Sequence, residues 1–378
     1  MEYKFSKLYS WTSGKPISAN EHGTIPVYGS NGIIGYTDNS KYFNKIILGR
    51  VGAYCGSVEY CPTEFNATDN TLITTCNEKL ITYPFAFYSL KLMKLNNFAG
   101  GSAQPLITQG LLKHLKCDVP SIEKQKIIAN ILSAYDNLIE NNNKRIKLLE
   151  QMAENLYKEW FVRFRFPGYE DVDFMDGFPK KWEKVKLDDV LNKIATGLNP
   201  RKNFVLGEGE NFYVTIKNMA DNTVYLDDKC DKVNDDAIIK INKRSDLKIG
   251  DLLFSGIGTI GRVCLIDIPT NNWNISESVF TMRANKKISS EFLYMLLLSQ
   301  DVQNYCQSKA NGSAQKGIRM GDLRKYTFLL PTKNVINDFT NQISPILRNV
   351  SLLRNENKNL IQQRDMLLPR LMSGKLEV

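Results

Sequence analysis

The chain has 378 residues, and its 49 lysines and arginines against 40 aspartates and glutamates give a formal charge of +9 at pH 7. A hydrophobic fraction of 43% beside a charged fraction of 24% excludes a wholly disordered chain. The length favours two domains of ordinary size over one small module. The positive charge favours an acidic partner such as nucleic acid, although a solvated basic surface gives the same count.

The cysteines and the apolar segments limit the class of protein further. The seven cysteines contain no CxxC pair, which argues against a disulfide framework and a zinc ribbon, so we expect reduced, mostly buried thiols. The first residues lack the apolar core of a secretory signal, and the apolar stretch Phe292–Leu298 is too short to span a bilayer. We therefore expect a cytoplasmic protein without a membrane partner.

An internal repeat organises the chain. The tetrapeptide GSAQ stands at residues 101–104 and again at 312–315, a separation of 312 − 101 = 211. At the same separation Gly110 falls on Gly321 and Pro120 on Pro331. Upstream, the glycine-rich segment 50–58 resembles segment 256–263, and Phe65-Asn66 matches Trp273-Asn274. Two copies are too few for a solenoid, so the order is module, helix, module, helix.

In chain order we predict a first module over 1–120, a helical region over 121–166, a second module over 167–331 and a second helical region over 332–378. Ile46–Leu48 and Asp251–Phe254 read as buried strands that enter glycine turns. Each module also carries a helical stretch before its GSAQ segment, at 84–94 and 290–308. This pattern predicts a mixed α+β fold in both modules, the first lacking the GFPKKW lead of the second.

The two helical regions share one heptad register. Apolar residues follow an alternating three-and-four spacing at Ile336, Phe339, Ile343, Ile346, Val350, Leu353, Leu360 and Leu367, and at Ile128, Leu132, Tyr135, Ile139, Ile146, Leu149, Ala153 and Leu156. Asn142 and Asn357 interrupt the apolar positions, as buried asparagines that fix register do.

Each helix alone can pack on its own module, which is the ordinary explanation of an apolar stripe. A helix of about 40 residues is about 60 Å long, however, and is longer than such a module is wide. We therefore expect the helices to pair with each other and to hold the modules apart. Ser344-Pro345 is a predicted kink, where the helix can restart.

The usual catalytic motifs are absent from the sequence. Residues 256–261 form a GxGxxG, but the following RVCLI predicts a strand where a dinucleotide fold requires a helix. His22 and His114 are isolated, which gives a histidine metal site or a catalytic triad little to use. No nuclease-like cluster of carboxylates and no phosphate loop is visible, so the sequence favours a binding protein.

At this point the chain resembles the specificity (S) subunits of type I restriction–modification systems. The resemblance rests on the order of modules and helices, on the two glycine turns and on the paired GSAQ segments. It also rests on the junction Glu159–Val162 before Gly177–Trp182, and on the tail Leu368–Gly374. It spans nearly the whole chain.

The resemblance implies two target recognition domains, each of which reads one half of an asymmetric bipartite site in double-stranded DNA. They are separated by two long helices that form an antiparallel coiled coil, with an internal pseudo-twofold repeat. Two modification (methyltransferase) subunits would dock on the helices, and restriction subunits would join them. AdoMet, ATP and Mg would act only in those partner subunits, so this chain is expected to hold no cofactor, no metal and no catalytic residue.

The expected DNA contacts lie in and around the repeated turns. Ser and Gln offer hydrogen bonds, and Gln104 and Gln315 have the side chain that pairs bidentately with adenine. The alternative is a polar turn in which Ser102 and Ser313 cap a helix. The full set of candidates is Ser102, Gln104, Ser313, Gln315, Lys316, Arg319, Arg50, Arg262, Lys217, Asn218, Arg201 and Lys202. For each basic residue the alternative is a solvated surface charge.

Two other classes of function stay open at this point. One is a self-contained DNA methyltransferase or nuclease, which AdoMet- or Mg²⁺-dependent turnover by the purified chain would support. The other is a coiled-coil adaptor that does not bind nucleic acid, which salt-sensitive retention on heparin would count against.

Overall fold

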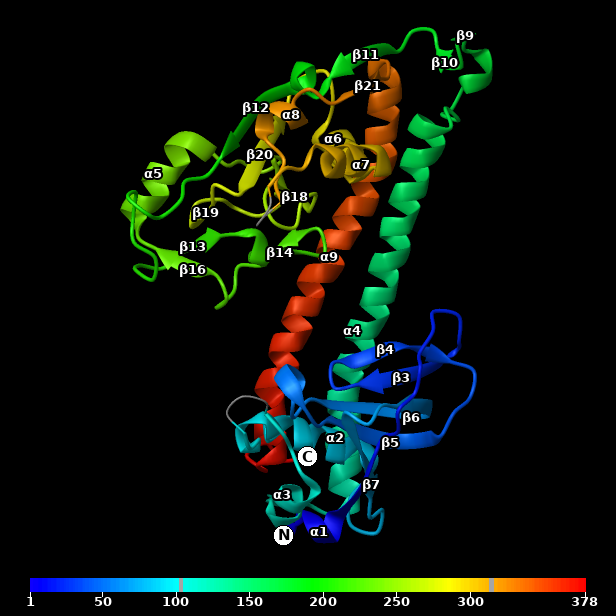
Figure 1. Ribbon diagram of the computed structural model, residues 1–378, viewed down its shortest axis with the longest axis vertical. Coiled ribbons are helices and arrows are strands. Elements are labelled where there is room, and N and C mark those ends of the chain that lie inside the picture. Colours follow the sequence, from blue (N-terminus) through cyan, green and yellow to red (C-terminus); the bar gives the residue numbers. More distant parts are fainter. Residues whose placement is uncertain (102–104, 313–315) are drawn as a thin grey trace. The chain divides into compact units, whose positions relative to one another are not determined.

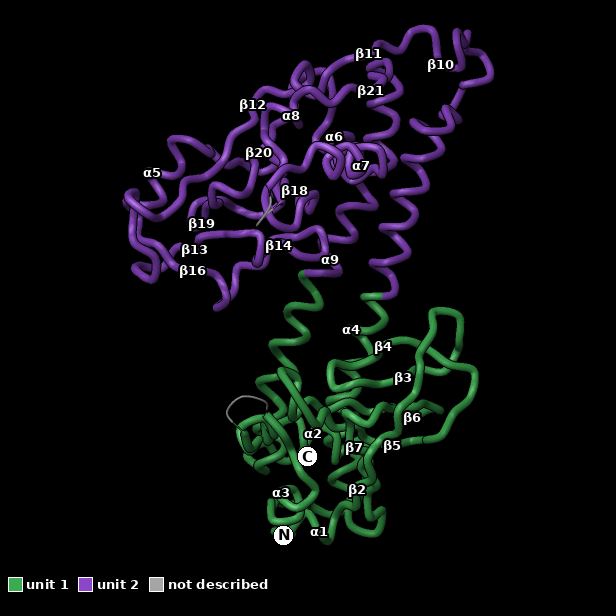
Figure 2. Tube along the Cα trace, in the orientation of Figure 1, with its two compact units in different colours: residues 1–143, 355–378 green, residues 144–354 purple. Residues whose placement is uncertain are grey.

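The computed structural model describes residues 1–101, 105–312 and 316–378. The chain divides into two compact units, one formed by residues 1–143 and 355–378 and the other by residues 144–354 (Figure 2). Both boundaries fall inside long helices, α4 (Ile122–Tyr157) and α9 (Lys333–Met372), so each unit contains one module and a part of both helices. The candidate GSAQ residues Ser102, Gln104, Ser313 and Gln315 lie outside the described residues.

The module of the first unit is built on a six-stranded sheet of order β2-β7-β5-β6-β3-β4 (Figure 1). Its strands are β2 (Tyr9–Ser13), β3 (Ile25–Gly29), β4 (Gly32–Thr37), β5 (Tyr42–Gly49), β6 (Val58–Ala67) and β7 (Thr71–Cys76). All neighbours are antiparallel except β3 and β6, which are parallel.

Short helices and a small two-stranded sheet complete this module. The helices are α1 (Phe5–Leu8), α2 (Tyr83–Leu92) and α3 (Gln109–His114), and β1 (Glu2–Lys4) pairs with β8 (Lys116–Asp118). The 3-10 turns are η1 (Gly52–Tyr54) and η2 (Leu95–Phe98). The core joins Phe5, Leu48 and Phe85 to Leu132 of α4 and Leu371 of α9, so this module packs on both helices.

The module of the second unit repeats this plan with its strands divided between two sheets. One sheet has the order β12-β20-β17-β18 and the other the order β16-β13-β19. The strands are β12 (Leu191–Thr196), β13 (Asn211–Val214), β16 (Asp231–Val233), β17 (Leu252–Ser255), β18 (Val263–Leu265), β19 (Trp273–Ile275) and β20 (Val279–Ala284). The strand β18 directly after the GxGxxG segment confirms that this segment is not a dinucleotide fingerprint.

The remaining elements of the second unit flank these sheets. Small pairs of strands are β9 (Phe174–Met175) with β10 (Phe178–Pro179), β11 (Glu183–Lys186) with β21 (Thr327–Leu330), and β14 (Met219–Ala220) with β15 (Thr223–Val224). The helices are α5 (Asp235–Ser245), α6 (Ser290–Leu298), α7 (Gln300–Lys309) and α8 (Met320–Leu323), with a π-helical turn, η3 (Lys158–Val162), after α4. The 3-10 turns are η4 (Tyr169–Asp171), η5 (Leu187–Val190) and η6 (Ile216–Asn218).

The predicted repeat is confirmed in three dimensions. Strand β3 pairs in parallel with β6 at Val27 and Asn66, and β13 pairs in parallel with β19 at Tyr213 and Asn274. The matched dipeptides therefore hold equivalent places, and Phe65 and Trp273 are both fully buried. Sequence similarity at these positions reflects the same packing in two modules.

The helices α4 and α9 pair in an antiparallel coiled coil within each unit. In the first unit Asn142 bonds Asn357, and Asp136, earlier in α4, pairs with Arg364, later in α9. In the second unit Ile146 and Leu149 pack with Val350 and Leu353. All the predicted heptad positions are buried or half-buried, which confirms the register.

The expected restart of the helix at Ser344-Pro345 is wrong, because α9 runs without interruption from Lys333 to Met372. A proline inside a helix removes only one N–H donor, and tertiary packing can hold the chain helical. Ile343 lies fully buried in the core of the second unit, and the Ser344 hydroxyl donates to the Thr340 carbonyl at 2.8 Å. Packing therefore holds the helix through this point.

Candidate nucleic-acid interface

In the first module, the glycine turn (residues 50–57, between β5 and β6) supports the base of the GSAQ loop. The Gly52 N–H donates to the Pro105 carbonyl at 3.1 Å, and the Ile107 N–H donates to the Arg50 carbonyl at 3.0 Å. Gly100 and Leu106 exchange two backbone hydrogen bonds, at 3.0 and 2.8 Å, which closes the loop. The residues on both sides of the GSAQ segment are thus held on a backbone platform.

In the second module, the glycine turn (residues 256–262, between β17 and β18) makes the same contacts. The Gly258 N–H donates to the Lys316 carbonyl at 2.8 Å, and the Ile318 N–H donates to the Gly256 carbonyl at 2.8 Å. Asn311 and Gly317 exchange two backbone bonds, both of 2.9 Å. The residues that flank the GSAQ segment therefore make the same backbone contacts in both modules.

A third segment joins each platform. It is the turn 68–71 between β6 and β7 in the first module and the turn 276–279 between β19 and β20 in the second. The Arg50 N–H donates to the Asn70 carbonyl at 2.9 Å, and the Gly256 N–H donates to the Ser278 carbonyl at 3.0 Å. We call the glycine turn, this strand-connecting turn and the base of the GSAQ loop the loop cluster of each module.

A glycine lets a fourth segment approach each loop cluster. A Cβ on Gly14, after β2, would stand 2.0 Å from the Thr68 carbonyl oxygen, and a Cβ on Gly197, after β12, would stand 1.6 Å from the Ile275 carbonyl oxygen. No real side chain fits at such distances, so both positions require glycine. Sequence comparison missed this pair because 197 − 14 = 183 differs from the separation of 211.

Four of the predicted DNA-binding residues lie in or beside the loop clusters: Arg50, Lys316 and Arg319, and Arg262 at the end of the second glycine turn. Arg50 opens the first glycine turn, and its Nε is buried without a hydrogen-bond partner in the described part of the chain. Lys316 and Arg319 flank the base of the second GSAQ loop, and both are exposed. The contact of Arg50, Lys316 and Arg319 with DNA stays a prediction.

Arg262 and Asn218 have structural contacts instead. The Arg262 guanidinium donates to the backbone carbonyls of Ile216 and Met219, and so holds the turn η6. Asn218 is 4% exposed, and its side-chain oxygen accepts from the Thr215 N–H at 2.9 Å, which caps the same turn. These contacts favour the interpretation of both residues as formers of local structure. Lys217, which precedes Asn218 in η6, is exposed.

Arg201 and Lys202 are exposed in the loop that follows Gly197. This loop begins at the second loop cluster, because the Gly197 N–H donates to the Ser276 carbonyl at 3.2 Å. The Tyr213 hydroxyl also lies 2.6 Å from the Leu198 carbonyl oxygen. The start of the loop is therefore fixed.

The thiols and histidines offer little reactive chemistry. All seven cysteines are free and six are buried, as predicted. Burial raises the pKa of the Cys76, Cys264 and Cys306 thiols to about 12, so each is neutral near pH 7. His22 and His114 are exposed, and the described residues hold no group of three or more metal-ligating side chains. In the same part of the chain, no helix is both long and apolar enough to cross a membrane.

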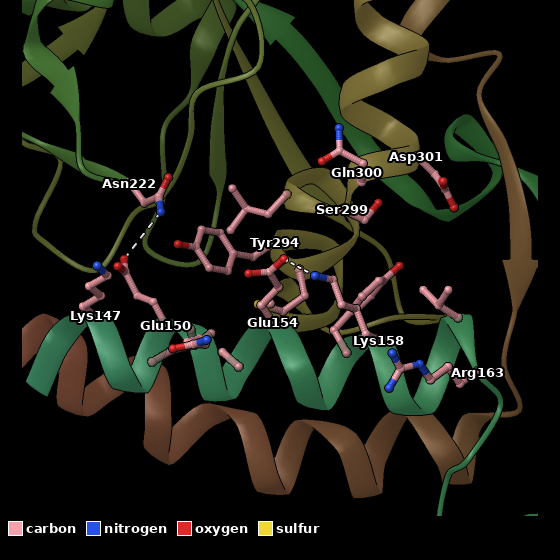
Figure 3. Close-up of a pocket in the computed structure, with 17 residues that line it drawn as sticks. Lys147, Glu150, Glu154, Lys158, Arg163, Asn222, Tyr294, Ser299, Gln300 and Asp301 are labelled. Carbon is pink, nitrogen blue, oxygen red and sulfur yellow. Dashed lines mark hydrogen bonds and ion pairs between the residues drawn. The ribbon is translucent and has the colours of Figure 1, made fainter. Parts of the chain in front are cut away.

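A groove of about 640 Å³ in the second unit lies between α4, α6 and the start of α7 (Figure 3). Glu150 accepts from Arg354 at 2.6 Å and lies 3.5 Å from the Asn222 amide, while Glu154 pairs with Lys158. These carboxylates are already occupied by partners of the same unit. The Asn222 contact links the second module to α4, the Arg354 pair links α9 to α4, and the Glu154–Lys158 pair lies along one helical segment.

The comparison with protein families identifies the class of this chain. The type I restriction modification DNA specificity domain matches residues 9–151 and, a second time, residues 179–363. The chain belongs to this family. The two matched segments each contain one loop cluster, so the family's domain is present twice, in agreement with the repeat.

Individual type I specificity subunits are similar to this chain in sequence or in fold. The chain is 26% identical over 309 residues to the type I restriction enzyme MjaIX specificity subunit of Methanocaldococcus jannaschii, covering 78% of this chain and 69% of that protein. It is 36% identical over 157 residues to the EcoprrI specificity subunit of Escherichia coli, covering 39% of each. The crystal structure of a type I S subunit from M. genitalium has the same fold, with a TM-score of 0.65 at 16% identity over 98% of this chain and 96% of that one.

Proposed function

We propose that this chain is the DNA-specificity subunit of a type I restriction–modification complex and that each module reads one part of an asymmetric, bipartite DNA site. The duplicated loop cluster carries the proposal. The two clusters share their backbone contacts but differ in side chains, with Arg50 and Pro105 in one and Gly256 and Lys316 in the other. A repeated platform with different side chains suits two different half-sites.

Adenine methylation and DNA cleavage would belong to partner subunits. Two modification subunits would bring AdoMet, and restriction subunits would bring ATP-driven cleavage with Mg²⁺. The role of this chain would be to place the partners on the DNA. The basic charge of +9 contributes attraction to phosphate that does not depend on sequence and weakens with salt.

Methylation mapping tests this proposal. Cells that express the chain with its modification subunit, and matched cells that lack only this gene, are compared by long-read sequencing. We expect a gapped, asymmetric methyladenine motif that disappears without the gene. A motif that persists without the gene would contradict the proposal, and methyl transfer by the purified chain alone would favour a self-contained enzyme.

A further inference from the structure

The strand-connecting turns of both loop clusters carry a carboxylate at the same place. The turn in the first module is Thr68-Asp69-Asn70-Thr71 and that in the second is Ser276-Glu277-Ser278-Val279. Each is closed by the same backbone bond, from Thr71 N–H to the Thr68 carbonyl at 3.0 Å and from Val279 N–H to the Ser276 carbonyl at 3.2 Å. Asp69 and Glu277 therefore hold equivalent positions in the two modules.

Turn propensity explains only one of these residues. Asp is common in tight turns because its short side chain bonds nearby backbone groups, whereas Glu has no such preference. What the two positions share is the carboxylate group. An unusual residue at a turn that also lies in the candidate interface points to a role for the charge.

Neither carboxylate is neutralised within the fold. In residues 1–101, 105–312 and 316–378, no lysine or arginine forms an ion pair with Asp69 or Glu277, although the chain carries an excess of nine positive charges. A carboxylate at a DNA interface is repelled by phosphates. It is favourable there only where a base offers it a hydrogen-bond donor.

Glu277 is also held in place. The hydroxyl of Tyr213, a residue that is 2% exposed, lies 3.2 Å from Oε2 of Glu277 and 2.6 Å from the Leu198 carbonyl oxygen. Burial, with the nearby Glu277 charge adding to it, raises the pKa of Tyr213, so the phenol keeps its hydrogen. The single hydrogen of this phenol is shared between the Leu198 carbonyl and Glu277, and the longer contact makes Tyr213 a weak positioning residue for the carboxylate.

We propose that Glu277 and Asp69 each read the exocyclic amino group of a base in the major groove, which is the N4 amino group of cytosine or the N6 amino group of adenine. This inference rests on the proposed function. Guanine and thymine present oxygen acceptors in the same groove, which a carboxylate repels. Each carboxylate would thus admit cytosine or adenine at one position of its half-site.

The test uses Glu277→Gln in the complex of the full chain with its modification subunits. Wild-type and variant complexes are incubated with a randomised duplex library at one fixed salt concentration, and the bound DNA is sequenced. A carboxamide can turn its NH₂ group to guanine or thymine. We therefore expect about a tenfold or larger loss of discrimination at one position of one half-site, with the other half-site unchanged.

Three further variants complete the design. Asp69→Asn should relax one position of the opposite half-site, and Tyr213→Phe should relax the Glu277 position by a smaller factor. Glu183→Gln removes the same charge from β11, away from the turns, and should preserve every preference. The unchanged half-site in each variant shows that the module not altered still folds and binds.

The outcomes separate the two proposals. A wild-type complex that selects no sequence overturns the proposed function and this inference together. A wild-type motif that Glu277→Gln and Asp69→Asn both retain, with uniformly tighter binding, leaves the proposed function intact and overturns the base-reading role. Loss of preference at all positions of a half-site would show a structural role for the turn and would also overturn it.

Discussion

The loop clusters of the two modules share their main-chain hydrogen bonds and differ in their side chains. Both support a GSAQ loop by the same backbone bonds, yet the residue whose carbonyl accepts from the loop is Arg50 in the first module and Gly256 in the second. A Cβ on Gly256 would stand 2.3 Å from the Phe280 ring, so an arginine does not fit there. The comparison teaches that the backbone of the loop cluster was preserved while its side chains diverged.

The coiled coil shows the same divergence after duplication. Asn142 pairs with Asn357 at 3.1 Å. The repeat separation relates Asn142 to position 353 (142 + 211 = 353) and Asn357 to position 146 (357 − 211 = 146). These positions hold Leu353 and Ile146, which pack as an apolar layer. One layer of the seam is therefore polar and its repeat counterpart apolar, so the two helices are not interchangeable.

The largest expected effect comes from replacing the glycine that approaches the loop cluster in each module. Gly197→Ala or Gly14→Ala should destabilise the affected module by about 3 kcal/mol or more, because the added Cβ meets a backbone carbonyl that side-chain movement cannot relieve. Thermal denaturation measures the loss. Gly110→Ala and Gly321→Ala, a repeat-related pair with no neighbour closer than 3.8 Å, are the controls and should keep or raise the melting temperature.

Replacing the glutamine of one GSAQ segment at a time tests whether each module reads its own half-site. Gln315→Ala should relax base choice by ~1–3 kcal/mol in one half-site, and Gln104→Ala should do so in the other, if each pairs bidentately with a base. Competition binding with duplexes changed at single positions measures this. Unchanged preferences in both variants would make the glutamines turn residues.

Arg262 tests whether the second module has its own structural support. Arg262→Ala should lower the stability of that module by about 1–2 kcal/mol, since two carbonyls of the η6 region lose a charged donor. Lys217→Ala, which removes an exposed positive charge from the same turn, is the matched control for stability. Equal melting temperatures for both variants would contradict this role of Arg262.

The smallest effect concerns the polar layer. Asn142→Leu should cost about 1 kcal/mol, because the Asn357 side-chain oxygen loses its donor while Asn357 keeps its bond to Asn143. Asn142→Leu with Asn357→Leu should recover that loss, since both buried polar groups are then gone and the exposed Asn143 side chain can bond water instead. A double-mutant cycle on melting temperature gives the coupling, and strictly additive losses would show that the pair does not interact.

The sequence alone predicted much of the fold and less of the site. Heptad spacing predicted the seam because the pairing of long helices follows a simple periodicity, and all predicted a and d positions are at least half-buried. The matched dipeptides Phe65-Asn66 and Trp273-Asn274 pointed to equivalent strands. The two dipeptides are separated by 273 − 65 = 208 residues, and the same separation aligns Asp69 with Glu277. The sequence therefore contained the information that the two strand-connecting turns are equivalent.

Other features depended on contacts between distant segments. Whether Arg262 faces a ligand or a backbone carbonyl is set by the folding of residues 216–219 against it, and periodicity carries no information about such a contact. The continuity of α9 through Pro345 likewise depended on the packing of Ile343 in the core. Local rules predicted an interruption there, and burial outweighed them.

The sequence by itself determined the duplication, the heptad register and the absence of familiar catalytic motifs, because repeats, periods and motifs are properties of residue order. Only the tertiary structure decided that glycine turn, strand-connecting turn and GSAQ base meet in one cluster per module. It also decided which candidate side chains stay exposed and which hold the fold. Those outcomes depend on hydrogen bonds and steric contacts between segments far apart in the chain, which residue order does not reveal.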